Sequence, residues 1–329
     1  MDKKSIVTLA FDLTKGFCKD HSVGEGVEVL RQALVDLNGG SKFDYKSFRR
    51  NKIEIYEIIE ELIPMIVTEK NKDNELFRLL VEERNAKEGD TFEFEVEDRT
   101  EFVVAEMARG IATPRRQRIH GKSSVAVHTT THGIRIYEEF ARFIAGRIDW
   151  NALVDGVARA YNNKVFDDIF AALSGITQDT PGMNSELIYG GTYSEAEILS
   201  IVDKLEGMTG RRAVIYGTKA ALRKCESAVQ SEEAKKSYYN NGYWGKLAGT
   251  DMVCLPNIYD RQNKKLIFPD NKLWILAGDD RPIKYCTEGE VYMSDTTEGN
   301  ADMTIEHTLI ARWGVAIVVG SEIGLVTLA

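Results

Sequence analysis

The sequence predicts a mixed α+β fold, because the period of its hydrophobic pattern changes along the chain. Over residues 1–70 apolar residues recur at helical spacing. Residues 91–97 instead alternate strictly between two faces, as a strand does. From 192 to 286 helical and extended stretches follow one another, which is typical of an α/β unit. With 329 residues the chain has room for about two domains, at roughly 100–200 residues each.

The composition is that of a folded protein without a strong positive field. Hydrophobic residues make up 43% and charged residues 28%, which excludes a wholly disordered or low-complexity chain. The net charge of −9 gives no general attraction to nucleic acid. The four cysteines are widely spaced and form no CxxC pair, which predicts reduced thiols. We therefore expect a reducing, cytoplasmic setting, with no signal-peptide core and no apolar run long enough to span a bilayer.

Two helices are predicted in the charged N-terminal region. The first ends at Gly39-Gly40, and its apolar positions are Val27, Val29, Leu30, Leu34 and Leu37. The second is expected from Tyr45 to about Val67, with Pro64 close to its end. This region could be a packed subdomain or an arm that lies on a neighbouring molecule.

A long β-excursion is predicted from 88 to 136. In residues 91–97 Phe92, Phe94 and Val96 face one way and three glutamates the other. Residues 101–105 could return as the partner strand, and 124–128 and 133–136 are again extended. Such a hairpin has little core of its own and is barely stable in water, so it must pack on this molecule or on the next.

The strongest predicted helix runs from Trp150 to Leu173, with Asp149 as its N-cap and Ser174-Gly175 at its end. Its apolar stripe comprises Trp150, Leu153, Val154, Val157, Tyr161, Val165, Ile169 and Leu173.

The α/β unit and the tail follow. We expect a helix capped by Ser194 that ends at Gly207 or Gly210, and a helix from Thr218 to Ala228. The strands expected are 212–216, 251–255, 265–268, 272–277, 303–312, 314–319 and 324–328.

Signatures of enzymes are missing or weak. The sequence has no GxxxxGK[ST], GxSxG or HExxH motif. Gly217-Thr218-Lys219 lies between a strand and a helix, where a phosphate could bind. The glycine-rich loop that a phosphate site needs is missing before it, which favours a turn with a helix cap. His128 and His132 are too far apart along a strand for one metal ion, at about 13 Å. We expect no catalytic residue, cofactor or metal.

A basic cluster interrupts the acidic chain within the β-excursion: Arg115, Arg116, Arg118 and Lys122. Three interpretations stay open, namely a solvated charge run, pairing with an acidic patch on a neighbouring copy, and contact with nucleic acid. The segment lacks the aromatic residues expected of a single-strand stacking platform. Together with Phe92 and Phe94, these four residues are the candidates for a subunit interface.

The order of these pieces resembles the major capsid proteins of tailed bacteriophages, which have the Hong Kong 97-type fold. Four stretches carry the resemblance over roughly Leu76 to Ala329. They are 136–139 before the long helix, 213–218 before the next helix, 245–257 ending in Leu-Pro-Asn, and 314–319.

The resemblance implies a domain plan. It has an N-terminal helical arm at 1–75, an extended loop at 76–135, and a peripheral domain with a spine helix at 136–191. An axial domain at 192–286 and a return to the peripheral domain at 287–329 complete it. It does not settle whether the arm is permanent or removed during processing.

The resemblance also implies a role as the head-shell protein of a phage or prophage. Hexamers and pentamers would form an icosahedral shell around double-stranded DNA, with portal and scaffolding proteins as further partners, in a virion assembled in the host cytoplasm. Two alternatives remain. One is an encapsulin-type compartment shell. The other is a cytosolic α/β enzyme that binds a phosphorylated ligand through the helix start at Thr218 and Lys219.

Overall fold

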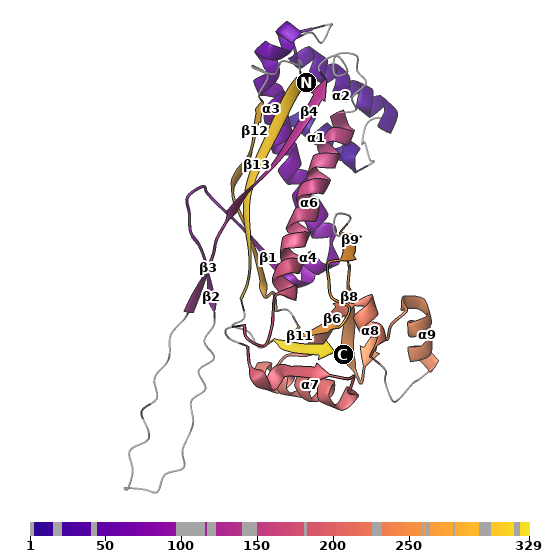
Figure 1. Ribbon diagram of the computed structural model, residues 1–329. Coiled ribbons are helices and arrows are strands. Elements are labelled where there is room, and N and C mark those ends of the chain that lie inside the picture. Colours follow the sequence, from indigo (N-terminus) through magenta and orange to yellow (C-terminus); the bar gives the residue numbers. More distant parts are fainter. Residues whose placement is uncertain are drawn as a thin grey trace. The chain divides into compact units, whose positions relative to one another are not determined.

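The computed structural model confirms a mixed α+β protein (Figure 1). It describes residues 3–15, 22–40, 45–96, 116, 123–139, 150–180, 183–225, 232–257, 259–260, 264–278, 280–295, 304–318 and 323–329. The chain divides into two compact units. Unit 1 comprises 1–90, 129–170 and 285–315, and unit 2 comprises 91–128, 171–284 and 316–329.

Unit 1 begins with helices α1 (Lys3–Thr14), α2 (Val23–Leu37), α3 (Tyr45–Asp73) and α4 (Glu75–Leu80). Ser22 and Glu25 form a capping box that starts α2. The expected end of α3 near Val67 is wrong, because the helix continues through Pro64 to Asp73. A proline inside a helix removes a hydrogen bond and costs about 3 kcal/mol. The buried neighbours Ile63 and Ile66 show that packing on this face outweighs that cost.

A four-stranded sheet forms the second part of unit 1, with strand order β1-β12-β13-β4. Strand β13 pairs antiparallel with β4 from Thr304↔Glu139 to Trp313↔Thr130. The bounds are β1 Val81–Ala86, β12 Ile283–Asp295, β13 Thr304–Ile317 and β4 Thr130–Glu139. The expected break between 303–312 and 314–319 is wrong, because β13 is continuous there.

The long helix α6 (Trp150–Ser174) has the predicted bounds, whereas Asp149 lies outside the described residues. Its predicted stripe is buried at Val157, Tyr161, Val165, Ile169 and Leu173. Beyond the stripe, Ala158, Phe166 and Phe170 are buried too. The Tyr161 hydroxyl donates to the Leu309 carbonyl at 2.8 Å, which ties α6 to β13.

Unit 2 contains a mixed six-stranded sheet in the order β5-β14-β11-β6-β8-β7. Strands β5 and β14 are parallel, as are β6 and β8, while β11 runs antiparallel to both β14 and β6. The bounds are β5 Ile188–Gly191, β14 Gly324–Leu328, β11 Lys272–Ala277, β6 Ala213–Thr218, β8 Thr250–Leu255 and β7 Lys246–Leu247.

Helix α7 (Glu195–Thr209) packs on this sheet through Ile198, Ile201, Val202 and Leu205. Ser194 is its N-cap, as predicted, and Gly210 ends it at φ 65°, a conformation that favours glycine. The Lys272 ammonium donates to the Ser174 and Ile176 carbonyls at 2.9 and 3.2 Å, so the C-terminal end of α6 is capped.

Short elements complete unit 2. The helix from Thr218 ends at Arg223 rather than Ala228, and the expected strand 265–268 covers only two residues. Strand β2 pairs with β3, whereas the expected partner 101–105 lies outside the described residues. The bounds are η1 Ser185–Leu187, α8 Lys219–Arg223, α9 Glu232–Asn241, β2 Phe92–Val96, β3 Ser123–Val127, β9 Tyr259–Asp260 and β10 Lys265–Leu266.

Candidate assembly surfaces

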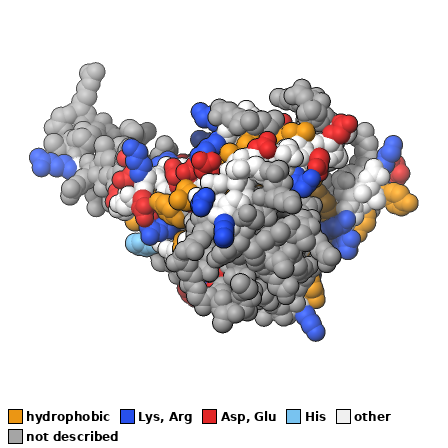
Figure 2. All heavy atoms as spheres, turned by 90° about the horizontal axis from the view of Figure 1, so that it is seen from above, with side chains coloured by type: hydrophobic (Ala, Val, Ile, Leu, Met, Phe, Trp, Pro, Cys, Tyr) orange, Lys and Arg blue, Asp and Glu red, His pale blue; other side chains and the backbone are white. Residues whose placement is uncertain are grey.

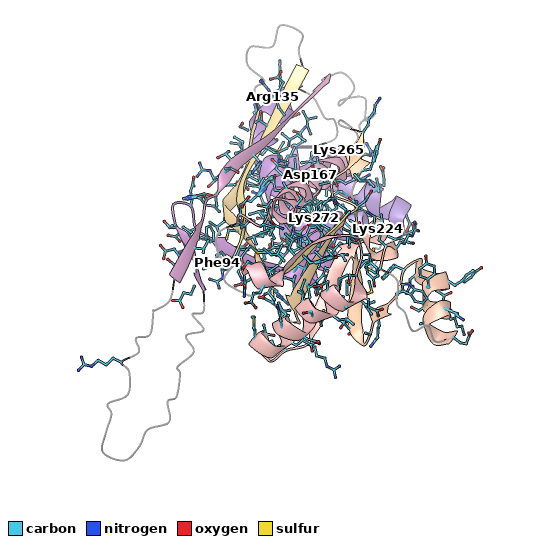
Figure 3. The ribbon with its side chains drawn as sticks, turned by 60° about the horizontal axis from the view of Figure 1, so that its bottom comes forward. Phe94, Arg135, Asp167, Lys224, Lys265 and Lys272 are labelled. Carbon is cyan, nitrogen blue, oxygen red and sulfur yellow. The ribbon has the colours of Figure 1, made fainter. Side chains whose placement is uncertain are left out.

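Strand β2 separates an apolar face from an acidic one, as predicted. Phe92 and Phe94 are 7% and 2% exposed, whereas Glu93 and Glu95 are exposed. Figure 3 labels Phe94 on this strand. The Lys284 ammonium lies 5.4 Å from the centroid of the Phe94 ring, a cation–π contact. Both rings therefore have a packing role within the chain. Their part in a subunit interface stays a prediction.

Of the predicted basic cluster, the structure describes one member. Arg116 is exposed, and Arg115, Arg118 and Lys122 lie outside the described residues. On the face that Figure 2 shows, acidic and basic side chains lie intermixed over the described surface.

Unit 1 contains an acidic cavity of about 600 Å³ between α3, β1, α6, β12 and β13. Its carboxylates are Glu57, Glu60, Glu61, Glu83, Glu288 and Glu290, against the single guanidinium of Arg312 among the lining residues. Burial raises the pKa of Glu83, so this carboxyl retains a proton more readily than an exposed glutamate. The local charge is suited to a basic group on a partner.

The Gly217-Thr218-Lys219 motif is accounted for by packing and capping. A Cβ on Gly217 would lie 2.6 Å from a methyl of the fully buried Leu273, which explains the glycine. The Thr218 hydroxyl accepts from the Ala221 N–H at 3.2 Å, and α8 is only five residues long. A turn with a helix cap therefore explains the motif without a phosphate.

His132 belongs to an aromatic cluster in unit 1. Its ring stacks on Trp313 with centroids 3.8 Å apart, and the Trp313 indole N–H donates to Asp168 at 3.1 Å. Burial lowers the pKa of His132. Within the described ranges no three metal-ligating side chains gather at one place. None of the helices described there is long and apolar enough to cross a membrane.

A family model covers nearly the whole chain. It is described as "SPbeta prophage-derived putative capsid protein YonB" and matches residues 21–327. No curated protein sequence matches the chain.

Solved structures with a similar fold are shells of phages and related particles. The capsid of cyanophage Pam1 has 10% identity and a TM-score of 0.50, over 73% of this chain and 85% of that chain. The mature capsid of bacteriophage PhiM1 has 12% identity and a TM-score of 0.49, over 78% and 87%. A virus-like particle from Pyrococcus furiosus has 12% identity and a TM-score of 0.43, over 81% and 98%. At such identities the Pam1 match indicates a shared fold.

Sequence reasoning missed β12 and with it Glu288, which contacts both ends of the segment 90–128. The alternation of Ile283, Tyr285 and Thr287 is the local signal that could have indicated a strand there.

Proposed function

The chain belongs to the YonB family of prophage-derived capsid proteins, and on that premise we propose that it is the major head-shell subunit of a tailed phage or prophage. Many copies would assemble as hexamers and pentamers into an icosahedral shell around double-stranded DNA. The family match over residues 21–327 carries this proposal, because it spans both units. Because that family is described as prophage-derived capsid proteins, the match favours a container for DNA over an encapsulin-type compartment for protein cargo.

We propose a Hong Kong 97-type organisation for the subunit. The peripheral domain would comprise α6 and the four-stranded sheet of unit 1. The axial domain, expected at 192–286, would be built on the six-stranded sheet of unit 2, which also takes in β5 and β14 from outside that range. The extended loop, expected at 76–135, would comprise residues 91–128. The reason is that α4 and β1 occupy 75–86, and β4 begins at Thr130 as an outer strand of the sheet.

The proposed role is structural rather than enzymatic, because forming a shell requires contacts between subunits and no catalysed reaction. The net charge of −9 suits a container that holds DNA without gripping it or reading its sequence. Portal and scaffolding proteins are the further partners proposed, and the virion is the proposed location.

The first experiment is light scattering with negative-stain microscopy of the recombinant chain. We expect closed, regular particles of several megadaltons, with a scaffold candidate co-expressed if the chain alone stays small. A chain that remains monomeric with that candidate would overturn the proposal.

For the basic cluster, we propose that Arg115, Arg116, Arg118 and Lys122 contact an acidic surface of a neighbouring copy. The acidic cavity of unit 1 is the candidate acceptor, because its lining carries six carboxylates and one guanidinium. Charge complementarity of this kind fixes partner and register more than it adds affinity.

A charge exchange tests this contact. Arg116→Glu should slow shell formation, and so should Glu61→Lys with Glu290→Lys, because each places like charges together. All three changes in one chain should restore shells. Lys236→Glu, a reversal on the exposed side of α9, is the control. If the combined variant forms shells more slowly than Arg116→Glu alone or the double lysine variant alone, the basic cluster has another partner. Filter binding to double-stranded DNA then tests whether that partner is nucleic acid.

A further inference from the structure

The two ends of the segment 90–128 start from opposite edges of the unit 1 sheet. Strand β1 leads into the segment and β4 leads out of it, and the strand order β1-β12-β13-β4 places two strands between them. At about 4.8 Å per strand, β1 and β4 are about 14 Å apart. Yet Gly89, after β1, and Thr129, before β4, meet at a single side chain.

That side chain is Glu288 on β12. One of its carboxylate oxygens accepts from the Gly89 N–H at 3.0 Å, and the other accepts from the Thr129 hydroxyl. The side chain is only 11% exposed, so water competes little for these bonds. The guanidinium of Arg312 on β13 lies 3.7 Å from the carboxylate and neutralises part of its charge.

The surrounding turn is held in place as well. Arg312 also pairs with Glu88 at 2.8 Å, and the Tyr292 hydroxyl donates to the same carboxylate at 3.0 Å. Gly89 has φ +89° and Gly289 has φ +70°, conformations that favour glycine. Gly289 lies directly after Glu288 within the continuous strand β12.

We propose that Glu288 is a positioning residue for shell assembly: its carboxylate clamps both ends of the segment 90–128 and so fixes how that segment leaves the sheet. This inference rests on the proposed shell function. The bonds lower the pKa of Glu288, first through the Thr129 hydroxyl, then through the Gly89 N–H, with Arg312 adding to them. The clamp is therefore ionised at neutral pH. Without it, the two ends would no longer be tied to one point.

Hydrogen exchange on the purified full-length chain tests the clamp directly. In Glu288→Ala, exchange of the Gly89 amide should rise about tenfold, the effect expected when one partially buried hydrogen bond is lost. Thr129→Val removes the other bond at nearly constant volume, and it should loosen the same segment even if the alanine variant does not fold. Lys236→Gln, a change at an exposed residue of α9 outside the acidic cavity, is the control. Unchanged exchange at Gly89 in Glu288→Ala, or at Thr129 and its neighbours in Thr129→Val, would overturn the clamp.

Shell formation tests the positioning role. We expect Glu288→Ala and Thr129→Val to assemble at least tenfold more slowly than the wild type, or into irregular particles, while Lys236→Gln assembles normally. Faster exchange together with wild-type assembly would overturn the positioning role. If the wild-type chain forms no shells even with a scaffold candidate, the proposed function fails, and the exchange measurement still decides whether the clamp exists.

Discussion

Placing a carboxylate on the buried face of α6 should unfold unit 1. Val157 is 3% exposed, so Val157→Asp removes apolar packing and buries an ionisable group. Losing the two methyl groups costs about 2 kcal/mol, the value also expected for Val157→Ala. Burial that raises the pKa of the introduced carboxyl by roughly 3 units adds about 4 kcal/mol at neutral pH. The sum of about 6 kcal/mol is comparable to the total stability of many domains.

Urea unfolding followed by circular dichroism at pH 7 is the assay, and Asn163→Asp is the matched control. Asn163 is exposed on the same helix, so the same charge there should change the free energy of unfolding by less than about 0.5 kcal/mol. Because the introduced carboxyl has a raised pKa when folded, its penalty should shrink as the pH falls from that raised value toward the unfolded value of about 3.9, whereas the deficit of Val157→Ala should not. A Val157→Asp variant as stable as the wild type would refute the assignment of the buried face.

Three further changes test other parts of the molecule. Gly217→Ala should lower the free energy of unfolding by about 1–3 kcal/mol, because its Cβ would lie 2.6 Å from the buried Leu273. Gly207→Ala in α7, where a Cβ meets nothing within 4 Å, should raise it slightly in the same urea unfolding assay. Burial raises the pKa of the Cys225 thiol to about 12, so alkylation at pH 8 should leave it unmodified in the native chain and label it in urea, as mass spectrometry of peptides would show. Because the pKa of Glu288 is lowered in the folded chain, the stabilisation it provides is complete above the unfolded value of about 4.3 and is lost as the pH falls through the folded value. The difference in Tm between wild type and Glu288→Gln should therefore be full near pH 7 and shrink as the pH falls below about 4.3. A difference that grows on acidification would contradict this assignment.

The elements predicted correctly are those whose ends are marked in the sequence by glycine or polar residues. Helix α6 was predicted because an apolar stripe ends at Ser174-Gly175. Strand β11 was predicted because it is a short apolar run between polar residues, and β14 because a short, largely apolar run follows Ser321-Glu322. The predicted break before Gly314 failed for a physical reason. A glycine weakens a strand locally, but β13 lies between β12 and β4, so it is paired on both sides, and it continues past Gly314 to Ile317.

The clamp could not be predicted, because it depends on contacts between distant parts of the chain. Glu288 lies 199 residues from Gly89 and 159 from Thr129, and a lone glutamate next to a glycine is an ordinary feature of any loop. Only the order of strands in the sheet brings these three residues together. The burial of Phe92 and Phe94 likewise depends on which face of the hairpin is covered, which alternation alone does not tell.

The packing of α1 bears on whether residues 1–75 stay in the shell. Lys3 pairs with Glu57 and Lys15 with Glu69, both at 2.6 Å and both 54 residues apart, so α1 runs parallel to α3. Between these pairs α1 buries Ile6, Val7, Ala10 and Leu13.

Removal of α1 would expose to water the apolar face of α3 that these side chains cover. At roughly 1.5–3 kcal/mol for each of the three larger side chains, the loss is about 5 kcal/mol or more. A segment that is shed during maturation must leave a surface that tolerates water or is covered at once by a neighbour. We therefore expect α1 to remain in the assembled shell, and the intact mass of the chain from purified shells checks this. A shell subunit that lacks residues 1–40 would show that a neighbouring copy covers α3 instead.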